Sequence, residues 1–282
     1  MTDGLTPAEV LARLRAYTES LVQPAWRPIV EDRPAKPHES SFCGTPWLPR
    51  GTKWPRCPCG RHRQLFAQID LAAFDGRFGD GWLQVFHHHG RRQFSPAALP
   101  HVAQLRQCDL GSHVRVVPKE PAEASGTVWN DRSRFPSRTI VGWERFDDWP
   151  SPERCAINYD GYEDDRGDDR FEIECAEAGL KVSLPHGDPE VGRLWQELWD
   201  HDGWAPSAIG GAVTRGDKVG GNARFIQCGG RPCCPKCDEP LRLLLQIDSN
   251  HSIDFMFGDS GRLFVFQCAG HLDELEHWWE CC

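Results

Sequence analysis

Two stretches of the chain share nearly the same succession of apolar and polar positions. Residues 65–70 read Leu-Phe-Ala-Gln-Ile-Asp, and residues 243–248 read Leu-Leu-Leu-Gln-Ile-Asp. Each is followed by a turn and a second apolar run, Phe-Gly-Asp-Gly-Trp-Leu-Gln-Val-Phe at 78–86 and Phe-Gly-Asp-Ser-Gly-Arg-Leu-Phe-Val-Phe at 257–266. Runs of this length between turn residues are typical of β-strands. The pattern predicts two β-hairpins related by an internal duplication, aligned with a one-residue gap.

Helical spacing occurs outside these hairpins. Thr6-Pro7-Ala8-Glu9 is typical of a capped helix start, and Asp188-Pro189-Glu190 begins a second helix. Their apolar stripes are Val10, Leu14, Tyr17 and Leu21, and then Val191, Leu194, Trp195 and Leu198. Further strands are expected at 113–117, 139–143 and 171–175. The predicted fold class is α+β, an internally duplicated and largely antiparallel β scaffold with a few peripheral helices.

The chain divides into a short lead-in and one long domain. Residues 1–40 hold the first helix and the start of a segment rich in Pro and Trp, which should be extended because Pro fixes φ and lacks an N–H donor. Residues 41–282 are expected to form a domain of two related halves, about 41–150 and 151–282. With 282 residues, 39% of them hydrophobic, the chain can bury a large core.

Cysteine and histidine spacing adds chemistry to the second hairpin. Cys234 and Cys237 form a C-x-x-C pair before it, and Cys268 and His271 form a C-x-x-H pair after it. Because the hairpin brings its two ends together, these residues predict a tetrahedral structural zinc site of the Cys3His type. The alternative is a set of buried thiols. A disulfide framework is disfavoured, because the thirteen cysteines are an odd number in a long chain without an expected export signal.

The first hairpin carries a reduced version of the same pattern. Cys57 and Cys59 are spaced only C-x-C, and His88 occupies the position that matches Cys268. Cys108 is the nearest further thiol along the chain. These four residues predict a second metal site. A solvated loop is the alternative for His88, since alternate side chains of the run 87–89 must point to opposite faces of a strand.

Gln68 and Gln246 occupy the same place in the two apolar strands. A buried amide must find hydrogen-bond partners or cost about 1 to 3 kcal/mol. Two interpretations follow. The amides either form a structural bridge between the two halves or recognise the backbone of a bound peptide, and the structural role is the expected one.

A family resemblance rests on these motifs, together with Ser-Phe-Cys-Gly-Thr-Pro-Trp-Leu-Pro-Arg-Gly-Thr-Lys-Trp-Pro at 41–55 and Lys-Val-Gly-Gly at 218–221. They resemble the bacterial YwqG-like family, a domain of unknown function, from about Ser41 to Cys282. Cys43 departs from the Gly usual in that family, and the Cys57–Cys59 pair is one residue shorter than the C-x-x-C pair of the second hairpin. The family is similar to the eukaryotic programmed-cell-death-protein-two group of zinc-containing ribosome-biogenesis factors. The resemblance implies a duplicated α+β domain with a binding role, as a chaperone or a toxin-immunity partner.

Charge and hydropathy restrict the partners. The formal net charge is −9, which would repel a phosphate backbone, so nucleic-acid binding is disfavoured and a basic protein partner is favoured. An acidic run at 159–169 adds to this. No run of 18 apolar residues and no signal peptide are evident, so no membrane association and a cytoplasmic location are expected.

The sequence also suggests two enzymatic hypotheses, a serine protease and a zinc-dependent hydrolase. Gly258-Asp259-Ser260-Gly261 resembles the nucleophile segment of chymotrypsin-like proteases, but Arg262 follows, and Gly81 aligns with Ser260 in the repeat. No His oriented by an Asp can be nominated from the sequence. A zinc-dependent hydrolase is the alternative function, with an open metal at Cys57, Cys59 and His88 and Asp80 as base. A sulfur-rich ligand set favours instead a protein-binding module without an assigned catalytic residue.

Overall fold

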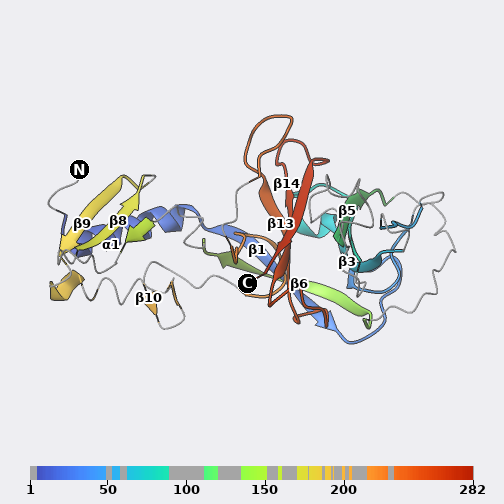
Figure 1. The fold of residues 1–282 in the computed structure, drawn as a ribbon. Coiled ribbons are helices and arrows are strands. Elements are labelled where there is room, and N and C mark those ends of the chain that lie inside the picture. Colours follow the sequence, from blue (N-terminus) through green and yellow to red (C-terminus); the bar gives the residue numbers. More distant parts are fainter. Residues whose placement is uncertain are drawn as a thin grey trace, which may run out of the picture. The chain divides into compact units, whose positions relative to one another are not determined.

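The computed structural model describes residues 5–48, 53–57, 62–88, 111–119, 135–150, 158–160, 170–176, 178–185, 188–191, 193, 199–200, 203–204, 215–227 and 232–281 (Figure 1). The chain forms two compact units. Unit 1 comprises Met1–Ala25, Arg145–Arg215 and Gly220–Gly229, and unit 2 comprises Trp26–Glu144, Gly216–Val219 and Gly230–Cys282. Residues of the expected second half therefore divide between the two units.

Unit 1 contains the predicted N-terminal helix, α1 (Pro7–Ser20). The Thr6 hydroxyl accepts a hydrogen bond from the Glu9 N–H at 3.3 Å, and the Glu9 carboxylate accepts one from the Thr6 N–H at 2.8 Å, which confirms the capping box. Val10 and Leu14 pack on an antiparallel sheet of β7 (Asn158–Asp160), β8 (Arg170–Cys175) and β9 (Leu180–Pro185). The short strands β10 (Trp199–Asp200) and β11 (Gly203–Trp204) form a separate pair.

The second predicted helix is described only in part. Residues 189–191 and 193 are helical, and the Glu190 N–H donates to the Asp188 carboxylate at 2.8 Å, as a helix start requires. Val191 is buried in the core of unit 1. Leu194, Trp195 and Leu198 lie outside the described residues.

Unit 2 is organised by a ten-stranded sheet in the order β15-β14-β13-β12-β1-β6-β2-β3-β4-β5. The strands are β1 (Gln23–Glu31), β2 (Ser41–Phe42), β3 (Gln64–Asp70), β4 (Trp82–His87), β5 (Ser112–Val117), β6 (Arg138–Asp148), β12 (Lys218–Gly220), β13 (Arg242–Asp248), β14 (Arg262–Gln267) and β15 (Leu275–Glu280). A short 3-10 helix, η1 (Leu71–Phe74), follows β3. The first and last strands approach each other, since a Cβ on Gly111, just before β5, would lie 3.7 Å from Trp279 Nε1 in β15. The sheet is therefore nearly closed.

This arrangement contradicts the predicted α+β class, because the protein is mostly antiparallel β. The main core contains Phe66, Phe74, Leu83, Leu245 and Val265, which come from strands and from the turns between them. A sheet that curves almost into closure buries its apolar face against itself, so helices are not needed to cover it. The Pro-rich lead-in also differs from the expected loop, since β1 lies within it.

The two predicted hairpins have the same strand register. In the first, Leu65 pairs with Phe86 and Ala67 with Val85, and the extra residue between them forms a bulge. In the second, Leu243 pairs with Phe266 and Leu245 with Val265, with the bulge at the same place. Gln68 and Gln246 therefore occupy equivalent positions.

The equivalence extends to the flanking strands. β2 pairs with β3 through Ser41↔Gln68, and β12 pairs with β13 through Lys218↔Gln246. The last strand pairs in the same way, with Trp82↔Val117 in one copy and Arg262↔Glu280 in the other. We call β2–β5 the N-terminal repeat and β12–β15 the C-terminal repeat. The strand order is consequently palindromic about the central pair β1 and β6.

Glycine positions follow the same correspondence and correct one alignment. Leu71 N–H donates to the carbonyl of Gly81, and Ser249 N–H donates to the carbonyl of Gly261, both at 3.0 Å. Gly81 is therefore the counterpart of Gly261. The alignment made from the sequence, which paired Gly81 with Ser260, was wrong at this position. Ser260 is an exposed turn residue with φ 52°.

Candidate metal centre

The first two candidate ligands lie on a tight turn before β13. The Cys234 N–H donates to the Glu239 carbonyl at 2.9 Å, and the Asp238 N–H donates to the Cys234 carbonyl at 2.8 Å. Asp238 closes the turn in the left-handed region, with φ 60°, which Asp tolerates better than most residues with a Cβ. The turn presents the side chains of Cys234 and Cys237 on one side, as a C-x-x-C knuckle requires.

The other two candidates follow β14 directly. The Cys268 N–H donates to the Glu274 carbonyl at 3.1 Å, and the Glu274 N–H donates to the His271 carbonyl at 2.9 Å. The His271 N–H also points at the Cys268 sulfur, 3.3 Å away. Because β13 and β14 are paired along their length, this turn lies beside the first knuckle.

The four predicted ligand atoms come together as one cluster. All lie within 4.8 Å of one another. Nδ1 of His271 is 3.6 Å from the sulfurs of both Cys234 and Cys268, and the sulfurs of Cys237 and Cys268 are 3.7 Å apart. Tetrahedral zinc with ordinary bond lengths would place two sulfurs about 3.8 Å apart and a sulfur and a nitrogen about 3.6 Å apart. The cluster could hold a metal ion and is compatible with zinc.

An ion pair ties the two turns together beside the cluster. Lys236 lies between the two cysteines of the first turn, and its ammonium group is 2.6 Å from the Asp273 carboxylate and 2.8 Å from that of Glu274. These acceptors raise the pKa of Lys236. The pair is partly exposed and adds little stability. It links the two turns that carry the candidate ligands.

The thiols influence one another's ionisation. Burial raises the pKa of Cys268, but the N–H groups of His271 and Gly270 and the neighbouring thiols lower it by more, so it lies below its ordinary value. The Glu239 N–H lowers the pKa of Cys237, while burial and the sulfurs of Cys234 and Cys268 raise it to about 11. One thiolate thus disfavours a second, and a divalent cation would allow all three to ionise.

The first-copy candidates are only partly described. Cys57 is buried, and its segment ends in a bond from the Arg63 N–H to the Pro55 carbonyl at 3.0 Å. The matching bond in the other copy runs from Leu241 N–H to the Pro232 carbonyl at 2.8 Å, so the first turn is one residue shorter. The His88 N–H donates to the Gly111 carbonyl at 2.7 Å, as Cys268 does to Glu274. Cys57 and His88 thus occupy the positions of candidate ligands in the C-terminal repeat.

Cys59 and Cys108 lie outside the described residues. Among the described residues, the Cys3His cluster is the group of side chains that could hold a metal ion. The second metal site stays a prediction. Asp80, the base of the alternative hydrolase, accepts a hydrogen bond from the Gly81 N–H at 2.7 Å and is 3.5 Å from the Lys119 ammonium group. Asp80 therefore stabilises the turn in which it lies.

Gln68 is fully buried and holds the segments on both sides of β2. Its oxygen accepts from the Trp47 N–H at 2.6 Å and from the Gln84 amide at 2.9 Å. Its nitrogen donates to the carbonyls of Pro37 and Glu39 at 2.8 and 3.1 Å. All four bonds go to this chain, so the amide is not available to a bound peptide and does not bridge the two halves.

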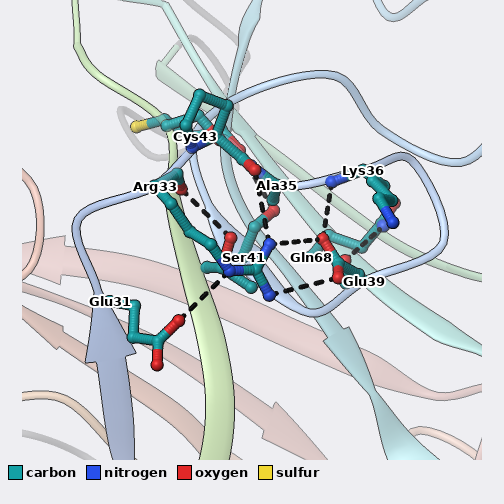
Figure 2. Close-up of polar contacts among 11 residues, drawn as sticks. Glu31, Arg33, Ala35, Lys36, Glu39, Ser41, Cys43 and Gln68 are labelled. Atoms are coloured by element: carbon teal, nitrogen blue, oxygen red, sulfur yellow. Dashed lines mark hydrogen bonds and ion pairs between the residues drawn. The ribbon is translucent and has the colours of Figure 1, made fainter.

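Figure 2 shows the polar contacts of the loop that precedes β2, beside Gln68. The Arg33 guanidinium group bonds both carboxylate oxygens of Glu39, at 3.1 and 3.2 Å, and also reaches Glu31. The Arg33 bond is the main cause that lowers the pKa of Glu39 to about 2. The Ser41 hydroxyl donates to the Cys43 carbonyl at 3.1 Å. These contacts close the loop on itself.

One constellation was missed from the sequence. Asp217 is buried, and its carboxylate is 3.1 Å from Nδ1 of His251 and accepts the N–H groups of Asp248 and Ser252. Asp217 raises the pKa of His251, whose side chain is half exposed. Asp217 is the counterpart of Ser40, whose hydroxyl accepts the Asp70 N–H at 3.0 Å. The sequence signal that could have indicated this pair is the place of Asp217, directly before the strand residue that matches Ser41 in the other repeat.

The fold and the cluster together define a mostly antiparallel β protein with a Cys3His group of metal-ligand type at the open end of a hairpin. The chain belongs to the family described as Domain of unknown function (DUF1963), whose model matches residues 40–272. This confirms the expected domain of unknown function, and the narrower YwqG-like name stays a prediction. A comparison with curated proteins found no match. Within the described part of the chain, no helix is both long and apolar enough to cross a membrane.

Proposed function

We propose that this protein is a protein-binding module whose C-terminal repeat is fixed by a structural zinc ion. The observation that supports the zinc assignment is the ligand set itself: the ligand atoms of Cys234, Cys237, Cys268 and His271 all lie within 4.8 Å of one another. Four protein ligands fill the coordination sphere of zinc, whereas a catalytic zinc keeps one position for water. The ion at this site would therefore stabilise the fold.

Burial supports the same assignment. Cys234 and Cys268 are 2% and 1% exposed, so the inner half of the cluster is shielded from water. Cys237 and His271 lie nearer the surface. Substrate would have no open metal position to approach. The alternative of a zinc-dependent hydrolase would need the other site, at Cys57, Cys59 and His88, and gains no support here.

The partner that we propose is a basic protein. The net charge of −9 favours association with a cationic surface and disfavours nucleic acid. The acidic run at 159–169 is the strongest local concentration of this charge in the sequence. The resemblance to chaperone-like and immunity-type families supports a dedicated client. The expected site of action is the cytoplasm, where thiols stay reduced and can bind zinc.

Affinity capture followed by reconstitution tests this function. The tagged full-length protein would be used to capture partners from its own cells, and a recovered basic protein would then be purified and its Kd measured over a range of salt concentrations. We expect a Kd that rises with salt and rises again when the acidic residues of 159–169 are changed to amides. The control changes the exposed Glu19 on α1 instead.

Two outcomes would overturn the proposal. One is recovery of no partner from cells that express the protein, together with turnover of a phosphoester or peptide library that His88→Ala abolishes. The other is a partner whose Kd depends on neither salt nor the acidic run. The first result would replace the binding module by the hydrolase.

A further inference from the structure

Arg115 on β5 is held in one orientation but is left with an unused donor. Its Nε donates to the Gln84 side-chain oxygen at 3.0 Å, and its guanidinium carbon lies 5.1 Å from the centre of the Phe86 ring. Gln84 is fully buried and is itself fixed by bonds to Trp47 and Gln68. One edge and one face of the guanidinium group are therefore occupied by the protein.

The Nη2 of Arg115 is buried and has no hydrogen-bond partner. Among the residues that the structure describes, no carboxylate pairs with this side chain. Trp47, whose backbone carbonyl accepts a bond from the Gln84 amide, also has a buried indole N–H without a partner. Buried donors are nearly always paired in proteins, because an unpaired one forfeits its bonds to water. The unpaired Arg115 Nη2 therefore suggests that an acceptor from outside the chain completes the bonding of this guanidinium group.

The C-terminal repeat shows that the fold does not require this arginine. The register places Trp278 at the position of Arg115, Phe264 at that of Gln84 and Phe266 at that of Phe86. Trp278 stacks on Phe266 at 4.7 Å with an interplanar angle of 14°. The same three strands are thus stable with an aromatic ring in place of the guanidinium group. Arg115 and Gln84 represent chemistry added to a scaffold that can be apolar.

The surroundings of Arg115 favour a negatively charged acceptor. Arg63 is 5% exposed and donates to the Ser112 carbonyl. Burial, followed by the charges of Arg63, Arg115 and His277, lowers the pKa of His113 to about 4. His113 is therefore neutral at pH 7 and offers a hydrogen bond without needing a counter-ion. The local field is positive although the whole chain is acidic.

We infer that Arg115, with its Nη2 and the neighbouring positive field, binds an oxyanion of the carboxylate or phosphate type beside the face of β4 and β5 that carries Gln84 and Phe86. A guanidinium group offers parallel N–H donors that match the oxygens of either anion. The rigid support by Gln84 and Phe86 means that little side-chain entropy is lost on binding. This site is separate from the zinc cluster and does not depend on the proposed protein partner.

The test follows the Arg115 Nε–H signal by NMR in ¹⁵N-labelled full-length protein. The signal is assigned by its loss in Arg115→Lys. Inorganic phosphate and acetate are titrated separately at constant ionic strength, with sodium chloride as the reference. We expect a saturable shift of this signal with at least one of the two anions, and the responding anion identifies whether phosphate or carboxylate is preferred. No saturable shift with either anion would overturn the inference.

Calorimetry with the responding anion provides the second measurement. Arg115→Gln should weaken binding by about tenfold or more, since a charged hydrogen-bond partner is lost. Arg27→Gln is the matched control, because it removes an equal charge from an exposed pair with Glu144, and it should leave the affinity unchanged. An affinity that survives Arg115→Gln, or falls equally in both variants, would refute the site. If Arg115→Gln fails to fold, the NMR titration of the unaltered protein decides.

Discussion

The N-terminal and C-terminal repeats have the same backbone and different chemistry. Both hairpins share one register and one bulge, and both are followed by a third strand paired in the same way. Yet the C-terminal repeat contains a Cys3His cluster and an aromatic stack, whereas the N-terminal repeat contains a buried amide network and a guanidinium group.

The difference shows which residues specify the fold. Positions that are apolar or glycine in both copies maintain the strands and turns. Gly81 and Gly261 illustrate this, because a Cβ on either would meet the carbonyl of the neighbouring third strand, at Val117 or Glu280. The candidate metal ligands in the turns and the charged groups on the strands differ between the copies. Function can therefore differ between the repeats without a change of scaffold.

The largest expected effect comes from removing a metal ligand of the C-terminal repeat. Cys237→Ser should abolish zinc binding and unfold the hairpin β13–β14, since structural zinc contributes about 10 to 16 kcal/mol and a whole domain is stable by about 5 to 15 kcal/mol. Metal analysis and urea denaturation measure both. Cys233→Ser is the control, because Cys233 is exposed and outside the cluster. Full stability of metal-free Cys237→Ser would contradict the structural role.

The next effect distinguishes the two equivalent glutamines. Gln68→Leu should destabilise by about 2 to 4 kcal/mol, because it leaves the Trp47 N–H and two loop carbonyls without a partner. Gln246→Leu should cost less, about 1 to 2 kcal/mol, because the bond from Gly216 N–H to the Asp248 carboxylate, at 2.9 Å, remains to hold the same segment. Denaturation curves at pH 7 give both values, and equal losses would show that the loop does not depend on Gln68.

The pKa values of two histidines, one in each repeat, should be shifted in opposite directions. His113 should titrate with a pKa of about 4, mainly because of burial, and His251 above its ordinary value because of Asp217. The His113 contribution to stability is present above about pH 6.5 and is lost as pH falls toward 4, by about 1 to 2 kcal/mol after allowance for partial exposure. That of His251 is present below about pH 6.5 and is lost as pH rises through its folded pKa.

NMR titration of the histidine ring protons gives both midpoints. His113→Gln should flatten the acid limb of the stability curve, and His251→Gln should leave that limb unchanged. Both histidines titrating near their ordinary value would contradict the environments described for them.

The smallest expected effect concerns Cys43, which has φ 58° where its counterpart in the other repeat is Gly220 with φ 70°. A Cβ at positive φ costs about 1 to 2 kcal/mol. Cys43→Gly should therefore be more stable than Cys43→Ala by about 1 kcal/mol, although both lose the buried thiol. Thermal unfolding of the two variants compares them directly. An alanine variant as stable as the glycine variant would mean that the left-handed conformation is not maintained.

The sequence predicted what is local and repeated. The α1 capping box follows from adjacent residues, and the hairpins follow from apolar runs that occur twice. The predicted Cys3His ligands meet because strand pairing joins the ends of one hairpin, so spacing alone was sufficient. The roles of Cys59 and Cys108 stay predictions.

The fold class was wrong because periodicity identifies elements and does not show how they close. Sheet closure depends on β1 and β6, which lie far from each other in the sequence and between the repeats in space. The Asp217–His251 pair and the donor of Arg115 were missed for a similar reason. Both depend on pairing between strands that no short motif encodes.

Zinc K-edge X-ray absorption of the purified, reduced full-length protein tests the central claim most directly. The account predicts zinc bound by three sulfurs at about 2.3 Å and one imidazole nitrogen at about 2.0 Å, without a coordinated water. If Cys57 and His88 bind a second ion, the averaged spectrum would change between the native protein and Cys59→Ser. Folded protein without zinc, or zinc bound mainly by oxygen, would contradict the assignment of the C-terminal cluster.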